Sequence, residues 1–129
     1  MEKDLELRTK RFALAAIKFT SSFPSARELD ILARQLVRAA TSIGANYRGA
    51  NRGVSRADFA NKIGTVQKEV AETQYWLELL IESNLCRKQA TATLQEESSE
   101  LLAIFTSMAR NLSSDCFLHS TSPFLKARS

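Results

Sequence analysis

Apolar residues recur along the chain at intervals of three and four, which is the spacing of one face of an α-helix. The repeat is most regular in residues 59–80 and 94–112, where it follows a heptad. Its positions are Phe59, Ile63, Val66, Val70, Thr73, Leu77 and Leu80, and then Leu94, Ser98, Leu101, Phe105, Met108 and Leu112. Each repeat predicts a helix that keeps one stripe against its neighbours.

Two further helices are predicted before these. The first turns Leu7, Phe12, Ala16, Phe19 and Phe23 inward and is stopped by Pro24. The stretch 25–28 has the capping-box pattern of a helix start, Gly53 supplies a stop, and Ser55 caps the next helix. The predicted helices are 4–22, 25–52, 55–84 and 88–112.

Connections this short make neighbouring helices antiparallel, so the sequence predicts an all-α, antiparallel, up-down-up-down four-helix bundle over residues 1–112. Only four glycines and two prolines in 129 residues agree with a few long helices. Residues 113–129 are rich in serine and aperiodic, and we expect them to form a flexible tail.

Composition excludes several classes of protein. A hydrophobic share of 44% with 25% charged residues is that of a globular domain, and no apolar run approaches the ~20 residues of a membrane span. The charged start of the chain does not resemble a signal peptide, which predicts a cytoplasmic location. Cys86 and Cys116 belong to no metal-binding motif, and a reducing compartment favours free thiols.

No catalytic pattern is present. His119 is the only histidine and lies in the predicted tail, and the sequence contains no Gly-rich phosphate loop or nucleophile motif. We therefore expect no enzyme activity, no cofactor and no metal. Glutamates are frequent on the third helix, where we expect them to be solvated or paired with Lys62 and Lys68.

The charge is unevenly distributed. Through Lys68 there are 13 basic and 6 acidic residues, and no acidic residue lies between Ile31 and Ala57. At ~100° per residue, four arginines of the second helix fall within an arc of about 80°. These are Arg34, Arg38, Arg48 and Arg52, with Arg56 extending the patch into the next helix. The pattern favours a phosphate-binding surface; the alternative is a solvated face, or arginines paired with acids of the third and fourth helices.

Two other groups of residues suggest an oligomer or partner interface. Ala33, Ala40 and Gly44 line one flank of the second helix, where their small side chains would let another helix approach closely. Tyr75, Trp76 and Leu79 lie away from the heptad stripe of the third helix. They would form an exposed apolar patch, typical of an interface, or else widen the buried face.

The chain resembles the four-helix bundle proteins encoded in intervening sequences of bacterial 23S rRNA genes, which are related to the accessory variability determinant of diversity-generating retroelements. The resemblance spans roughly residues 5–112 and is carried by QLVRAATSIGANYR at 35–48, SRADF at 55–59, KIG at 62–64 and KEVAETQYWL at 68–77. Gly49 departs from the family, which commonly carries glutamate three residues after Asn46. The absence of that acid removes a partner for a neighbouring basic group and leaves the region more positive.

The resemblance implies a homopentameric ring with a basic surface, and its retroelement members bind nucleic acid and a reverse transcriptase. Together these observations predict a non-enzymatic oligomer that binds RNA or DNA backbone through the arginines of the second helix. The alternative is a protein-interaction adaptor whose Tyr75, Trp76 and Leu79 patch docks a partner such as a reverse transcriptase.

Overall fold

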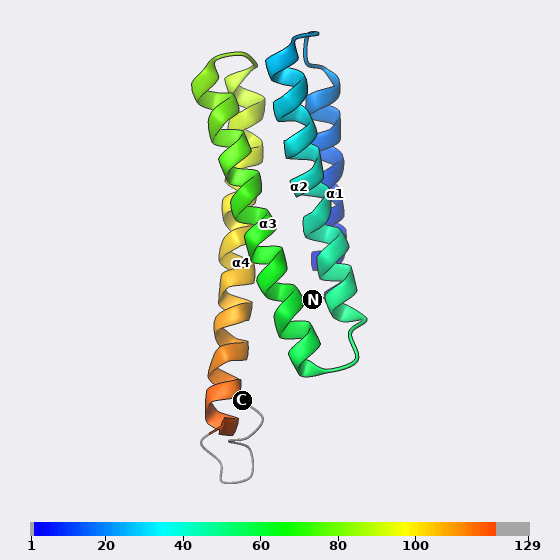
Figure 1. Cartoon of the computed structure of the whole chain (residues 1–129), viewed down its shortest axis with the longest axis vertical. Coiled ribbons are helices and arrows are strands. Elements are labelled where there is room, and N and C mark those ends of the chain that lie inside the picture. The colour runs from blue at the N-terminus through cyan, green and yellow to red at the C-terminus, as the bar shows by residue number, and fades with distance from the viewer. Residues whose placement is uncertain (1, 121–129) are drawn as a thin grey trace.

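The computed structural model describes residues 2–120, with side chains for residues 4–113. It contains four helices and, over this range, no strand: α1 (Glu2–Ser21), α2 (Arg27–Asn51), α3 (Arg56–Ser83) and α4 (Lys88–Ser120). They run alternately up and down the long axis of the molecule (Figure 1), which confirms the predicted fold class. None of the helices in residues 2–120 has a segment long and apolar enough to cross a lipid bilayer.

The buried stripes of α3 and α4 are those that the heptads predict. All the predicted α3 positions are buried except Phe59, which packs at the edge of the core. On α4 the first four predicted positions are buried, and Met108 and Leu112 pack against the core from its margin. Tyr47 of α2 and Phe105 of α4 meet edge to face in this core, with ring centroids 5.3 Å apart.

The inward side of α1 differs from the prediction at Leu7, whose residue surface is 44% exposed. Leu5 and Thr9 are buried in its place, because with Phe12 and Ala16 they follow the helical period. Sequence reasoning overlooked Thr9 because it is polar. Its hydroxyl donates to the carbonyl oxygen of Leu5 at 2.9 Å, so it enters the core with its hydrogen bond satisfied.

The helix ends were predicted with mixed success. Ser55 caps α3 by accepting from the Asp58 amide at 3.0 Å, as expected. The predicted capping box at Ser25 is wrong, since the N-cap of α2 is Ala26 and no side chain caps it. At the other end of the chain α4 runs to Ser120, past the predicted end at residue 112, so the predicted tail begins too early. Residues 121–129 of that tail lie outside the described residues.

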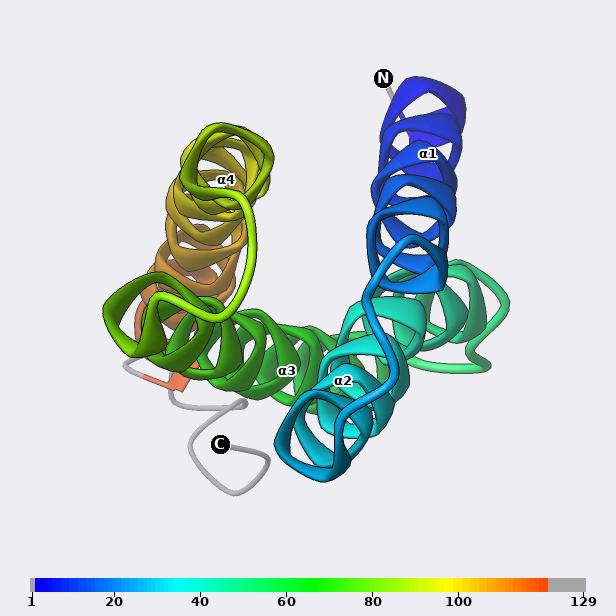
Figure 2. The same ribbon diagram turned by 90° about the horizontal axis from the view of Figure 1, so that it is seen from above.

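The four helices are not packed evenly. α2 and α3 lie side by side, with α1 against α2 and α4 against α3. Figure 2 shows α1 and α4 standing apart on the same side of the α2–α3 pair. Arg8 of α1 spans this separation with hydrogen bonds of 2.7 and 2.8 Å to Glu97 and of 2.7 Å to Glu100. The two carboxylates raise the pKa of Arg8, Glu97 contributing more, so its charge is permanent.

The small residues of α2 serve contacts within the chain. A methyl group on Gly44 would lie 3.1 Å from the Thr9 hydroxyl oxygen, so α1 crosses α2 closely at this point. Ala40 is fully buried, and Ala33 is half-buried. At Gly44, the close helix approach that the sequence predicts for this flank therefore occurs between α1 and α2 of one chain.

We expect Gly44→Leu to destabilise the protein by about 1–3 kcal/mol, because its side chain has no room against Thr9. Gly64→Ala is the matched control: a methyl group there meets nothing within 4 Å, and better helix propensity should stabilise α3 by up to ~1 kcal/mol. Urea unfolding followed by circular dichroism measures both. Equal effects of the two substitutions would contradict the close approach of α1 and α2.

Candidate nucleic-acid interface

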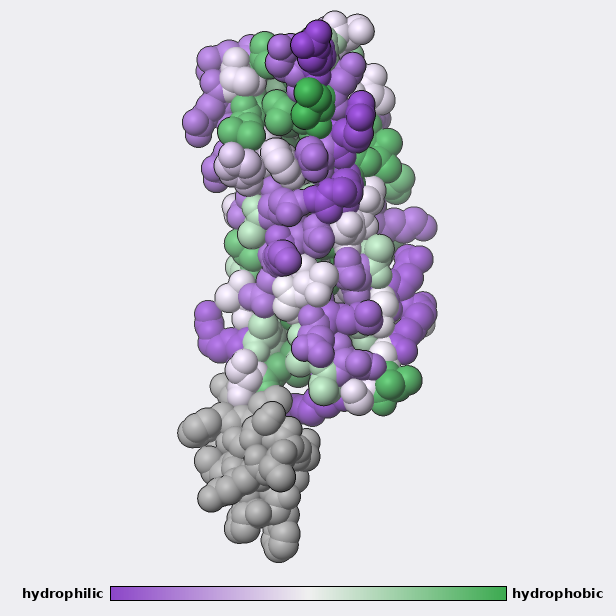
Figure 3. Space-filling view, viewed as in Figure 1, coloured by the Kyte–Doolittle hydropathy of each residue, from purple (hydrophilic) through white to green (hydrophobic). Residues whose placement is uncertain are grey.

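The candidate site is the outer side of α2. Burial of its opposite side, which includes Leu36, Ile43 and Tyr47, turns the arginines at 34, 38 and 48 outward along one unbroken helix, and a fourth, at 52, follows at its C-cap. We call Arg34, Arg38, Arg48 and Arg52 the arginine face. Figure 3 shows the side of the molecule formed by α2 and α3, where hydrophilic residues cover most of the surface. The side chains of Arg38, Arg48 and Arg52 remain 49%, 53% and 64% exposed.

Arg38 leans from α2 toward α3. Its guanidinium contacts the carboxylate of Glu72 and lies 3.6 Å from that of Glu69. The Glu69 side chain is only 17% exposed, and Arg38 is the cation that lies against it. Arg38 is therefore engaged in holding α2 to α3, as the alternative interpretation of the sequence expected.

Arg48 and Arg52 lean toward α1 and share one carboxylate. Each lies 3.5 Å from Glu6, and the Asn51 side-chain amide donates to the same carboxylate at 2.8 Å. The Asn51 hydrogen bond, aided by the two arginines, lowers the pKa of Glu6. This acid comes from the first helix, whereas the sequence suggested partners on the third and fourth.

Arg34 differs from the other three arginines. It is exposed, and no carboxylate among the described residues pairs with it. Arg56 is also exposed, at the first position of α3, but it has interactions of its own. Arg34 is thus the member of the arginine face whose charge is not used within the described fold.

Lys62 of α3 joins this surface, which sequence reasoning missed. Its stem lies beside Gly49 of α2: the Cδ and Cε atoms are 3.6 and 3.8 Å from where a side chain would begin there. Lys62 pairs with no carboxylate among the described residues, although the sequence suggested one of the α3 glutamates. The sequence feature that could have identified Lys62 is Gly49, because the absence of an acid at this position of α2 leaves a neighbouring basic residue unpaired.

The predicted apolar patch on α3 is mostly covered. Tyr75 is 52% exposed and meets Trp76 edge to face at a centroid distance of 5.2 Å. Trp76 packs against the core, and Leu79 is half-buried. The patch therefore offers little more than one tyrosine ring, and the interpretation that these residues widen the buried face fits Trp76 and Leu79.

The fold and the arginine face define an antiparallel four-helix bundle with a basic outer helix. The family model of the 23S rRNA-intervening sequence proteins matches residues 3–107, so the chain belongs to that family. Among solved structures, a protein of unknown function from the S23 ribosomal protein family of Bacteroides thetaiotaomicron is 32% identical, with a TM-score of 0.75. The match covers 81% of this chain and 96% of that one. No curated protein matches the chain.

We expect Arg38→Gln to lower the free energy of unfolding by about 1 kcal/mol, because it leaves two carboxylates one turn apart without their cation. Arg34→Gln, the matched change one turn away, should leave stability within ~0.5 kcal/mol of the original chain. Urea unfolding at low salt measures the difference. If both variants unfold alike, Arg38 has no structural role.

The lowered pKa of Glu6 predicts a pH dependence. Its stabilising effect is fully present above the ordinary value of 4.5 and disappears as the pH falls through the lower pKa of the folded state. We expect the difference in urea midpoint between the original chain and Glu6→Gln to shrink between about pH 5 and about pH 3, in step with protonation of Glu6. A difference that stays constant across this range would rule out the effect.

Proposed function

We propose that this protein binds nucleic acid through the phosphates, using the arginine face together with Lys62. The observation that carries the proposal is an excess of exposed cations over carboxylates on one rigid surface. Four arginines and Lys62 stand against Glu6, Glu69 and Glu72, and no other acid contacts them among the described residues. Guanidinium groups suit this task because they bind phosphate oxygens in a bidentate manner.

The ion pairs divide the surface into two kinds of cation. Arg38, Arg48 and Arg52 are held in place by carboxylates, so binding a phosphate there competes with an existing partner. Arg34 and Lys62 face no such competition within the described residues. They should therefore contribute most to binding, and the paired arginines should mainly set the positive potential of the face.

In this proposal the protein is not an enzyme. Assembly into a homo-oligomer, such as the ring of five that the family resemblance implies, would present several copies of the face and raise the avidity for a long polyanion. Light scattering of the full chain measures that assembly. A role as the accessory protein of a retroelement is one setting in which such binding would be used.

The second candidate function is docking of a protein partner, for which Tyr75 on α3 gives limited support because its neighbours are covered. The larger uncovered apolar surface lies on the opposite side of the molecule, between α1 and α4. Tyr75→Ala would abolish the binding of a partner docked at Tyr75 at any salt concentration.

The test is a salt titration of binding to a fluorescent single-stranded RNA. Removing one phosphate-binding cation should lower the slope of log affinity against log salt by about 0.7, so Arg34→Gln with Lys62→Gln should lower it by about 1.4. The matched control is Arg110→Gln on α4, an exposed arginine away from the arginine face. Unchanged affinity and slope in the double variant, with normal folding, would refute the proposal.

A further inference from the structure

The apolar surface left open by the uneven packing forms a continuous groove between α1 and α4. Three hollows of about 570, 390 and 560 Å³ follow one another along these helices. The first two share Ala15, Thr93 and Leu94, and the last two share Phe19, Ser22 and Arg87. We call this feature the α1–α4 groove.

Apolar side chains lie along the whole length of the groove, between polar and charged ones. Phe12 and Leu94 are buried beneath it, and Phe19 packs against the core at its middle. An exposed leucine stands at each end, Leu7 at 44% and Leu85 at 46%. Exposed apolar surface that is continuous with the core is costly to leave in water, and it usually marks an interaction site.

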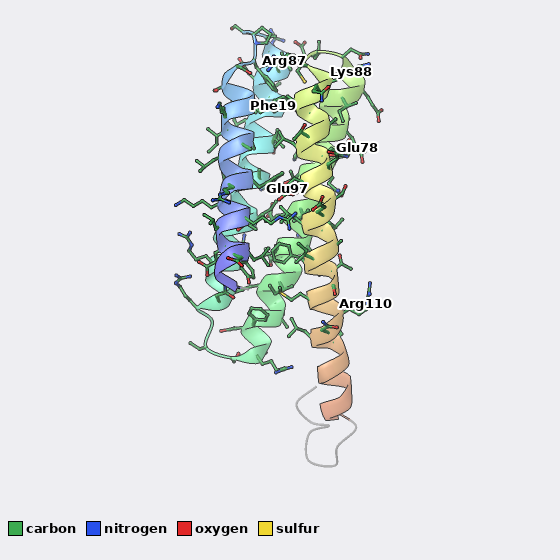
Figure 4. The ribbon with its side chains drawn as sticks, turned by 180° about the vertical axis from the view of Figure 1, so that it is seen from behind. Phe19, Glu78, Arg87, Lys88, Glu97 and Arg110 are labelled. Atoms are coloured by element: carbon green, nitrogen blue, oxygen red, sulfur yellow. The ribbon has the colours of Figure 1, made fainter. Side chains whose placement is uncertain are left out.

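The rim of the groove is positively charged. Arg11 and Lys18 of α1 and Arg87 before α4 are exposed, and none pairs with a carboxylate among the described residues. The groove contains two acids, and Glu97 is already engaged by Arg8. In Figure 4, which views the molecule from behind, Phe19, Arg87 and Glu97 lie along the side where α1 and α4 face each other.

We propose that the α1–α4 groove binds an amphipathic helix of a partner protein, with its apolar stripe on Phe12, Phe19 and Leu94 and acidic residues on its flanks. Helices recognise apolar grooves through side chains spaced at three and four residues. Beyond Arg8, whose link to Glu97 crosses between α1 and α4, the groove runs for about 18 Å from Arg11 to Phe23, which the central part of a helix of about 16 residues would fill. The unpaired cations on α1 and just before α4 select acidic flanks and fix the register of the helix.

The charge of the chain argues against a second copy as the occupant through its own α1. The exposed apolar side of that helix, with Leu14 and Ile17, also carries Lys10 and Lys18. Placing this side in the groove would bring cations together with Arg11 and Arg87. A partner with acidic flanks avoids that repulsion.

The test uses a fluorescent synthetic peptide of about 16 residues with leucines at helical spacing and glutamates on both flanks. A matched peptide carries lysines in place of the glutamates. Anisotropy with the full chain should show tighter binding of the glutamate peptide. Lys18→Glu with Arg87→Glu should weaken that binding by about tenfold or more, whereas Arg34→Glu with Lys62→Glu should leave it unchanged.

A steric variant tests the position without a change of charge. Ala15→Trp should fill the groove and abolish peptide binding, because Ala15 is exposed and lines two of the hollows. Ala71→Trp, on the outer side of α3, is the control and should bind normally. Circular dichroism verifies that both variants fold.

Four outcomes would overturn the proposal. Equal binding of the two peptides, or normal binding by Ala15→Trp, would mean that the groove does not select such a helix. Conversion of an oligomer to a monomer by Ala15→Trp would make a second copy the occupant. Loss of RNA binding in the Lys18 and Arg87 double variant, with Arg34 and Lys62 dispensable, would make the groove the nucleic-acid site.

Discussion

The structure depends on the burial of one apolar stripe of α2 between its two neighbours. α2 packs against both α1 and α3, and α4 packs against α3. The positions of the other three helices therefore depend, directly or through α3, on the burial of this stripe. Because the arginines occupy the opposite side of the same rod, burying Leu36, Ile43 and Tyr47 also exposes Arg34 and its companions. The burial that folds this protein therefore also orients its basic surface toward the solvent.

The same constraint explains why the two sides of the molecule differ. α2 and α3 make their most extensive contacts with each other, and the helices at the two ends of the chain each pack against one of them. α1 and α4 are then joined chiefly by the hydrogen bonds of Arg8 to its two glutamates. Apolar surface remains open beside this link, on the same side of the molecule. One side of the bundle is thus charged and closed, and the other is apolar and open.

Most of the fold could be predicted from sequence because the heptads of α3 and α4 reflect a single physical demand, one stripe facing the core. The predictions were wrong where a polar residue is buried, an apolar residue is exposed, or a helix continues without an apolar stripe. Thr9 is buried through a local hydrogen bond, Leu7 is exposed beside the groove, and α4 continues where its apolar repeat has ended. The candidate site was harder, because pairing depends on which neighbour each side chain reaches. A helical wheel places Arg38 and Arg48 on one side of α2 but does not show that Glu72 and Glu6 meet them.

The sharing of carboxylates along α2 has a consequence for how the sequence can change over evolutionary time. Selection for folding alone would retain Arg38, Arg48 and Arg52, since each holds α2 to a neighbouring helix. Arg34 and Lys62 have no such duty among the described residues and would drift unless a ligand required them. If relatives retain these two cations, that conservation would therefore indicate a function. Conservation of the arginines as a group would not, because folding alone explains it.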